Sequence, residues 1–281
     1  MQPWNSHVRL CTQLLRRHMP RVTVLIPSYM PEPDYVLACL AGLEAQTYRD
    51  FEVLIIDESK PEVRAFLSSC KTSFPLRIMN PQARLGLAKS LNYGIANCLS
   101  ELIARHDIDD ICEPERLEKQ VTYLDAHKEV SAVGSATIKI GADGENLGVR
   151  HFPLTPPEIK RYSGMRNPFC HSAITLRRSF FEHYGLYSED MEAEDYELWL
   201  RALKLGAKMI NLPEALVQYR IETHNGKPRP RYWRETFSLR ARYLSWDNLL
   251  IRLTGLLLTG IAAITPPKLF DYVYWIFNRL R

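Results

Sequence analysis

The sequence predicts an α/β fold built on a mostly parallel sheet, and three observations lead to this prediction. Apolar, β-branched runs alternate with helical patterns over the first ~110 residues, as they do where each strand is followed by a helix. The run FEVLIID at 51–57 is almost continuously apolar, as in a parallel strand buried on both faces. A cluster of aspartates directly follows the fourth predicted strand, at the edge where open α/β sheets bind ligands.

In the first half of the chain, the spacing of apolar residues distinguishes helices from strands, and residues that end strands or begin helices mark their bounds. Apolar residues recur every three to four positions in the predicted helices, whereas the strands are rich in valine, isoleucine and leucine. The predicted elements are strand 21–27 ended by Pro27, helix 34–46, strand 51–57, strand 76–80, helix 87–98 and strand 101–106.

The second half continues with both patterns, and its last helix is strongly amphipathic. We expect helix 113–127 with Pro114 in its first turn, strand 130–140, turn 141–148, strand 172–178, helix 179–185 closed by Gly185, helix 194–206 closed by Gly206, and strands 207–213 and 215–221. A break follows at ETHNGKPRPR. The expected divisions are 1–20, 21–225 with halves 21–125 and 126–225, and 226–281.

Charge is distributed unevenly along the 281 residues, whose net charge is +4. The segment 226–281 holds ten basic and three acidic residues, a balance of +7, and the preceding residues carry −3. The partner of the basic charge should therefore be sought at the C-terminal segment. Six cysteines without metal-ligand spacing, and an N-terminus without a sustained apolar run, predict reduced thiols and a cytoplasmic protein.

Three aspartates crowd the sequence HDIDD, directly after a predicted strand: Asp107, Asp109 and Asp110. Either water screens them on an ordinary acidic turn, or a cation lies among them. An EF-hand is excluded, because Ile111 and Cys112 stand where an oxygen ligand and glycine are required. A glycine-rich phosphate loop is absent from the sequence. The remaining metal reading is Mg²⁺ or Mn²⁺ held by one or two carboxylates beside phosphates, with Asp110 facing the following helix.

A second acidic pair, Glu194 and Asp195, opens the helix predicted at 194–206. Acidic residues in a first turn stabilise a helix through its dipole, and that reading alone would explain the pair. Two acidic sites with different neighbours also fit a division between a metal carboxylate and a general base. Both readings stay open on these residues alone.

Five motifs in order resemble the family 2 glycosyltransferases with a GT-A fold. They are VTVLIPSYMPEPDYVLACLAGLEAQTYRDFEVLIIDES, NPQARLGLAKSLNYGI, ARHDIDDICEPERLEKQ, RNPFCHSAITLRRS and AEDYELWLRAL. The resemblance covers about residues 21–221 and is closest to bacterial members that build lipopolysaccharide or capsule repeat units. It implies a Rossmann-like, mostly parallel sheet flanked by helices, with 21–125 as the nucleotide-sugar half and 126–225 as the acceptor half.

The resemblance implies a nucleotide-sugar site at the ends of the first strands. The residues at matching positions are Pro27, Ser28, Tyr29, Asp57, Glu58, Arg84, Gly86, Asn92 and Asp107. Glu58 departs from the family, which has aspartate at this position. This departure leaves open which acid contacts the base, and a UDP-sugar is the favoured donor.

The same resemblance implies a role for each of the acidic residues. Asp109 is expected to be the main ligand of Mn²⁺ or Mg²⁺, and Asp107 to contact the ribose or a metal-bound water. Asp195 matches the catalytic base of inverting members, and Glu194 would shape the pocket or orient Asp195. The reaction implied is transfer of a hexose with inversion.

Three further residues are expected near the substrates or the metal, on weaker grounds than the acidic residues. His171 matches a position that lines the acceptor pocket, although a lone histidine is also often structural. Arg220 would approach the acceptor and the diphosphate from a flexible segment, and His224 would be a third metal ligand. His106 is interpreted as structural, because alternate strand residues point to opposite faces and Asp107 is its neighbour.

The C-terminal segment has two readings. Its apolar run 253–265 is 13 residues long, short of the ~20 needed to span a bilayer. It is either a helical extension packed on the rest of the chain or an interfacial anchor at an anionic membrane, with aromatic residues among the basic ones. The aromatic residues are Trp233, Trp246, Tyr272, Tyr274, Trp275 and Phe277. No nucleic-acid-binding module accompanies the charge.

Together these features predict a metal-dependent transfer from a nucleotide-sugar to a lipid-linked saccharide, at the inner face of the cytoplasmic membrane. Two alternatives remain. One is transfer to a polyprenyl phosphate, which would normally bring longer membrane helices. The other is a non-catalytic GT-A domain that binds sugar nucleotides, and the Glu58 departure favours it slightly.

Overall fold

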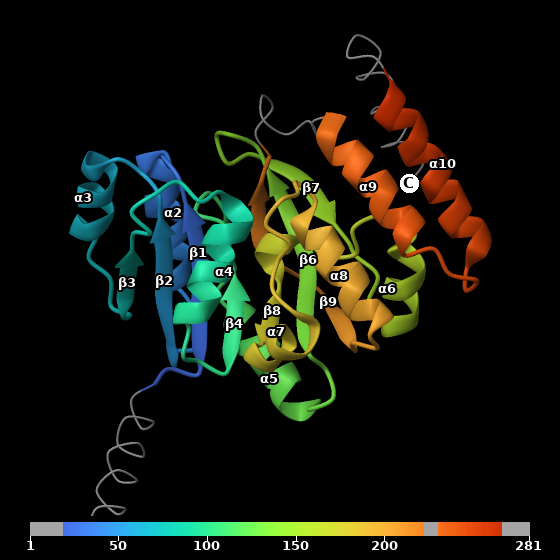
Figure 1. The fold of residues 1–281 in the computed structure, drawn as a ribbon. Helices are drawn as coiled ribbons and strands as arrows, with labels where there is room; N and C mark the ends of the chain where they lie inside the picture. The colour runs from blue at the N-terminus through green and yellow to red at the C-terminus, as the bar shows by residue number, and fades with distance from the viewer. Residues whose placement is uncertain (1–18, 222–229, 266–281) are drawn as a thin grey trace, which may run out of the picture.

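The structure is a computed structural model of the chain, and it describes residues 19–221 and 230–265. In these residues nine strands form one sheet flanked by helices (Figure 1). The strand order is β3 (Leu76–Met79), β2 (Phe51–Asp57), β1 (Val22–Ser28), β4 (Leu102–Arg105), β8 (Thr175–Arg177), β6 (Ala132–Ile140), β9 (Met209–Arg220) and β5 (Ile111–Cys112), with β7 (Asn146–Arg150) beside β6. The predicted α/β class and mostly parallel sheet are therefore confirmed.

The first four strands in this order are parallel, which aligns their carboxyl ends. Ser28, the last residue of β1, pairs with Asp57, the last of β2. β8 runs antiparallel between β4 and β6, so β6 and its parallel neighbour β9 have the direction of β4. The chain therefore presents the residues that follow β1, β2 and β4 at one edge of the sheet.

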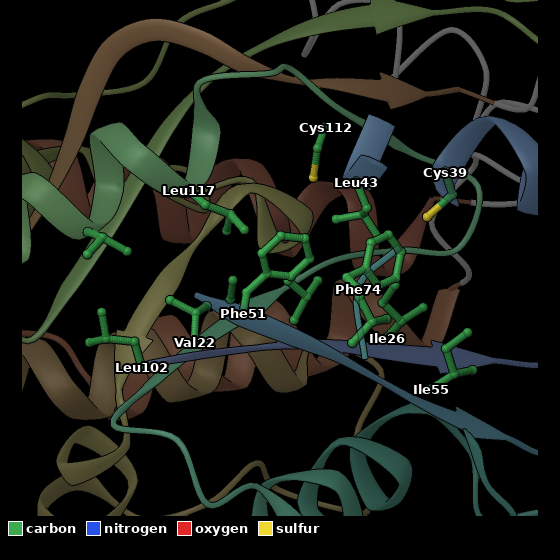
Figure 2. Close-up of a cluster of buried hydrophobic side chains, with 14 of the residues drawn as sticks. Val22, Ile26, Cys39, Leu43, Phe51, Ile55, Phe74, Leu102, Cys112 and Leu117 are labelled. Carbon is green, nitrogen blue, oxygen red and sulfur yellow. The ribbon is translucent and has the colours of Figure 1, made fainter. Parts of the chain in front are cut away.

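Two hydrophobic clusters fill the two faces of the sheet. On one face, alternate residues of β1 and β2 pack against α2 (Pro33–Glu44) and α5 (Arg116–Ala126). Figure 2 shows part of this cluster, with Phe51 of β2 among side chains of β1 and of both helices. The other face packs against α4 (Leu87–Asn97), α7 (Arg178–Tyr184) and α8 (Glu194–Lys204). The remaining elements before the C-terminal segment are α3 (Pro61–Ser69), α6 (Pro156–Tyr162) and the 3₁₀ turn η1 (His171–Ala173).

The described part of the C-terminal segment is a helical hairpin, α9 (Pro230–Arg242) and α10 (Leu249–Ile264), which forms the outermost layer of the molecule (Figure 1). The buried guanidinium of Arg240 donates to the carbonyls of Gly255, at 2.7 Å, and Met165. A Cβ atom on Gly255 would lie 2.2 Å from the carbonyl oxygen of Gly164, so backbone meets backbone there. The hairpin thus packs on the preceding residues, as one of the two readings predicted.

None of the helices in the described ranges is long and apolar enough to cross a membrane. Four of the aromatic residues named for the interfacial reading, at 272–277, lie outside those ranges.

Most predicted elements are confirmed, and strand 51–57 has the predicted bounds. Pro27 does not end its strand: it still pairs with Ile56, and β1 continues to Ser28. Pro114 lies before α5 rather than in its first turn, and its carbonyl accepts a hydrogen bond from the Thr47 N–H at 2.9 Å.

Two further differences concern strands. The turn predicted at 141–148 contains the start of β7. The two strands predicted around Pro213 are one strand, β9, because the ladder with β6 shifts register from Leu212 to Ala215. This irregularity leaves Pro213, which has no N–H to donate, out of the ladder.

Candidate functional site

Asp57 is fully buried at the end of β2, and both of its carboxylate oxygens are engaged. Oδ1 accepts hydrogen bonds from the Ser28 hydroxyl and the Ser59 N–H, each at 3.2 Å, and Oδ2 pairs with Nε of Arg64 at 3.3 Å. Asn80 donates to the Asp57 carbonyl at 2.7 Å. Of the residues predicted to bind the nucleotide, Ser28 and Asp57 are thus joined directly across two neighbouring strands.

Glu58 points from β2 to the loop before α4. Its Oε2 accepts the N–H groups of Leu85 at 2.9 Å and Gly86 at 3.1 Å. Gly86 has φ +83°, a left-handed conformation that favours glycine. The Arg84 guanidinium lies 4.1 Å from the centroid of the Tyr29 ring, which is half exposed. The longer side chain at position 58 therefore spans to the loop that carries Arg84.

Asn92 is buried on α4 and binds the segment that precedes α8. Its amide group accepts from the Tyr187 N–H at 3.0 Å and donates to the Tyr187 carbonyl at 2.9 Å and to Glu189 Oε1 at 3.1 Å. These contacts give Asn92 a structural task, and its contact with a nucleotide stays a prediction.

The three crowded aspartates have three different environments. Asp107 is partly exposed, and its carboxylate pairs with the guanidinium of Arg105, a residue of β4 that is only 3% exposed. Asp109 is also partly exposed, and its backbone carbonyl accepts from Nε of Arg220 at 2.9 Å. Asp110 is buried, and its Oδ1 accepts the Arg220 N–H at 2.8 Å.

The expectation that Asp110 faces the following helix is therefore wrong. Its carboxyl turns to the end of β9, 110 residues further along the chain. Burial, then the charges of Asp107 and Asp109, raise the pKa of Asp110 well above its ordinary value. The crowding is eased because Arg105 balances the Asp107 carboxylate and the raised pKa of Asp110 disfavours a third charge.

The donor set at this turn suits Mg²⁺ or Mn²⁺ that takes part of its ligands from phosphates. Asp107 and Asp109 offer two partly exposed carboxylates, and such ions are commonly held by one or two carboxylates plus substrate phosphates. No cluster of three or more His, Cys, Asp or Glu side chains suitable for a metal occurs within 19–221 and 230–265. His224, the third ligand expected from the sequence, lies outside these residues.

The second acidic site opens α8. Glu194 is 6% exposed, and Asp195 accepts from the Asn167 amide at 2.6 Å. Burial, then the neighbouring Asp195, raise the pKa of Glu194 to about 8, and burial raises the pKa of Asp195. The charge of Arg105 lowers the pKa of Glu194 and of Asp195. The cation that pairs with Asp107 therefore also acts on the second acidic site.

Arg105 was not among the residues predicted from the sequence. A signal for it was present, because LIARH places an arginine in a short apolar run directly before the aspartates. A buried arginine in a strand requires a charge partner, and Asp107 lies two residues away on the same chain.

His171 lies between the aromatic residues near α8. Its Nε2 is 2.8 Å from the Tyr187 hydroxyl, and its ring stands edge-on to Trp199. Burial, then the charge of Arg105, lower the pKa of His171 well below its usual value, so the ring is neutral at physiological pH. Its contact with an acceptor stays a prediction.

Arg220 does not lie in a flexible segment as expected, because it is the last residue of β9 and is buried. Its guanidinium donates to the carbonyls of Gly141 at 2.9 Å and Ala142 at 2.8 Å and lies 4.1 Å from the centroid of the Tyr35 ring. In this structure Arg220 ties the acidic turn to β9. Its role toward an acceptor stays a prediction. His106 is fully buried beside Arg116, in keeping with a structural role.

Comparison with known proteins gives consistent matches. The family model described as glycosyl transferase family 2 matches residues 23–185. The amylovoran biosynthesis glycosyltransferase AmsE of Erwinia amylovora is 35% identical over 201 residues, covering 70% of this chain and 75% of that protein. An Escherichia coli UDP-Gal:alpha-D-GlcNAc-diphosphoundecaprenol beta-1,3-galactosyltransferase is 24% identical over 266 residues, covering 91% of this chain and 95% of that protein.

Solved structures agree on the fold. S. aureus TarS 1-349 in complex with UDP-GlcNAc has a TM-score of 0.66 at 16% identity, covering 92% of this chain and 80% of that one. The mannosyltransferase PcManGT of Pyrobaculum calidifontis, in complex with GDP-Man and Mn2+, has a TM-score of 0.56 at 18% identity, covering 93% and 80%. The fold is thus the GT-A fold expected from the sequence.

Proposed function

Because the chain belongs to glycosyltransferase family 2, we propose that it transfers a sugar from a UDP-sugar to a hydroxyl group of a lipid-linked saccharide, with inversion at the anomeric carbon. The observation that carries this proposal is the position of the buried Arg105, which pairs with Asp107 and whose charge also lowers the pKa values of Glu194 and Asp195. One site follows β4 and the other opens α8, and the buried guanidinium of Arg105 acts on both. A donor site beside a base site is the arrangement that inverting transfer requires.

The donor would lie along the carboxyl ends of β1, β2 and β4. The TarS complexes with UDP and UDP-GlcNAc support a uridine nucleotide in this chain. We propose Asp57 and the Tyr29–Arg84 pair as the residues nearest the nucleoside. Asp107 and Asp109 would hold Mn²⁺ or Mg²⁺, which supplies charge that stabilises the departing diphosphate.

Asp195 would act as the general base. Its carboxylate accepts the proton of the acceptor hydroxyl while that oxygen forms a bond to the anomeric carbon, and the bond to the diphosphate oxygen breaks. Asn167 holds the carboxylate in place at 2.6 Å. Arg105 favours the ionised form of Asp195 against the cost of burial. Glu194, with its raised pKa, would retain the proton that the pair shares near neutral pH.

The proposed acceptor is a saccharide on a polyprenyl diphosphate at the inner face of the cytoplasmic membrane. The name of the E. coli relative, which specifies diphosphoundecaprenol, supports this substrate class. Large apolar side chains also stand exposed on and beside α10: Trp246 (89%), Leu250 (81%), Leu257 (64%) and Ile264 (82%). We propose that this face contacts an anionic membrane, to which the +7 charge of 226–281 is complementary.

The catalytic proposal is tested with purified protein, a panel of UDP-sugars and Mn²⁺. Slow release of UDP that stops with EDTA is expected, and Asp195→Asn should lower transfer to an acceptor by about 10²–10⁴-fold. Near-wild-type transfer by Asp195→Asn would refute the base. Donor binding without any turnover would instead favour a non-catalytic sugar-nucleotide-binding domain.

The membrane proposal is tested by co-sedimentation with vesicles of phosphatidylcholine, with and without phosphatidylglycerol. Leu257→Glu should reduce binding to the anionic vesicles. The matched control is Leu205→Glu, because Leu205 is 61% exposed, directly follows α8 and is not a residue of the hairpin. Equal binding by both variants, or a dimer that Leu257→Glu dissociates, would refute membrane contact through α10.

A further inference from the structure

We infer that α9 belongs to the catalytic unit and that Glu235 is a positioning residue for the proposed base, Asp195. This inference rests on the proposed function of the Glu194–Asp195 pair. By sequence Glu235 lies in the segment 226–281, outside the region 21–225 that the motifs define. In the structure its carboxylate reaches the chain immediately before α8.

The contact is made at the backbone that leads into the acid pair. Oε2 of Glu235 accepts the Glu192 N–H at 2.6 Å and the Ala193 N–H at 3.2 Å. Glu235 is also paired with Arg231, one turn earlier on α9, at 2.7 Å. The Arg231 guanidinium donates in turn to the Asp190 carbonyl at 2.5 Å. Two side chains of α9 therefore hold the segment that leads into α8.

The start of α8 has no N-cap side chain of its own. Ala193 is its N-cap residue and has no side chain that could accept a backbone N–H, whereas Ser, Thr, Asp or Asn usually perform that task. Glu235 does not replace that cap, because it accepts the N–H groups of Glu192 and Ala193, which precede the first helical turn. It places a carboxylate from another helix next to the positive end of the α8 dipole. Asp195 is two residues past Ala193, so the position of its carboxylate depends on the backbone that Glu235 holds.

Residues near the end of α9, and Tyr243 directly after it, contact the first turn of α8. Nε of Arg240 donates to the Tyr196 hydroxyl at 3.1 Å, and the Tyr243 hydroxyl donates to Glu197 Oε1 at 3.1 Å. Leu239 is buried in a cluster with residues of α8. The two helices are therefore joined at several points, and the contact of Glu235 differs from these in binding the backbone directly before the acids.

Three variants of one residue separate position from charge. Glu235→Gln keeps an acceptor oxygen at the same reach and should retain most of kcat. Glu235→Asp keeps the charge but is one methylene shorter and should lose activity, as should Glu235→Ala. We expect kcat to fall roughly 10-fold or more with little change in donor KM, since misplacing a reacting group by about 1 Å can cost about 10²-fold.

The matched control is Glu182→Ala on α7. Glu182 forms an i,i+4 ion pair with Arg178 at 3.7 Å, as Glu235 does with Arg231, but its side chain is 61% exposed and this ion pair lies within α7. Glu182→Ala should leave kcat unchanged. Activity of Glu235→Asp equal to that of wild type would overturn the inference.

A double-mutant cycle with Asp195→Asn tests whether Glu235 acts through the base. In that background Glu235→Asp should lower the residual rate by less than about 2-fold, because the group that it positions is already lost. An equal fold-change in both backgrounds would overturn the inference. Full activity of Asp195→Asn alone would refute the proposed base itself, which is a separate and distinguishable outcome.

Discussion

Replacing Glu194 by glutamine should change how stability depends on pH. Glu194 is 6% exposed, and burial followed by the charge of Asp195 raises its pKa from an ordinary value of 4.5 to about 8. Folding therefore favours the protonated carboxyl. The stability that this preference contributes is fully present below about pH 4.5 and is lost as the pH rises through about 8. Glutamine resembles the protonated form and does not ionise, so Glu194→Gln should escape this loss.

The size of the effect follows from the same shift. A pKa difference of this size corresponds to at most about 5 kcal/mol, at 1.36 kcal/mol for each pH unit. Water entry and proton sharing with Asp195 reduce it, and we expect about 2 kcal/mol between pH 5 and pH 9. For a chain of this length that corresponds to a gain of about 4–8 °C in Tm at pH 9, relative to wild type.

The measurement is thermal unfolding of both proteins at pH 5, 7 and 9, at constant ionic strength. The two Tm values should lie close together at pH 5 and diverge toward pH 9, with the variant more stable. Parallel curves, or a variant that loses stability faster with pH, would refute a buried acid with a raised pKa at this position.

Three further predictions concern packing, the loop before α4 and the metal. Gly255→Ala should lower the free energy of unfolding by about 1–3 kcal/mol, because its Cβ would lie 2.2 Å from the Gly164 carbonyl oxygen. Gly260→Ala should be tolerated, because its Cβ would meet only the ring of Phe237, at 3.2 Å. Denaturant unfolding of the two variants compares these effects. Glu58→Ala removes the acceptor of two backbone N–H groups and should cost about 1.5–3 kcal/mol in the same assay. Asp109→Ala should abolish the rise in Tm that Mn²⁺ with UDP produces in wild type, as read by thermal shift.

The strands and most helices could be predicted because their signals are local. The run 51–57 is apolar on both faces, and this alone indicated a parallel strand with the correct bounds. Errors arose where a partner strand decided the outcome. Pro213 suggested two strands, and only the ladder with β6 shows that one strand accommodates it through a register shift.

The acidic sites could be located from the sequence, but the environment of each carboxylate within them could not. HDIDD and the acids opening α8 were identified by their place after a strand and at a helix start. The three aspartates differ because Asp107 meets Arg105, whereas Asp110 is buried against β9. Burial and a neighbouring charge set each pKa, and neither can be read from spacing.

The sequence by itself determined the α/β class, the family and the positions of the two acidic sites, because strand periodicity and motif order are written in consecutive residues. Only the tertiary structure decided that Arg105 acts on both sites, that Asn92 holds Tyr187, and that Glu235 reaches the start of α8. The last two contacts join residues 95 and 43 positions apart, and such pairs meet only when strands and helices pack.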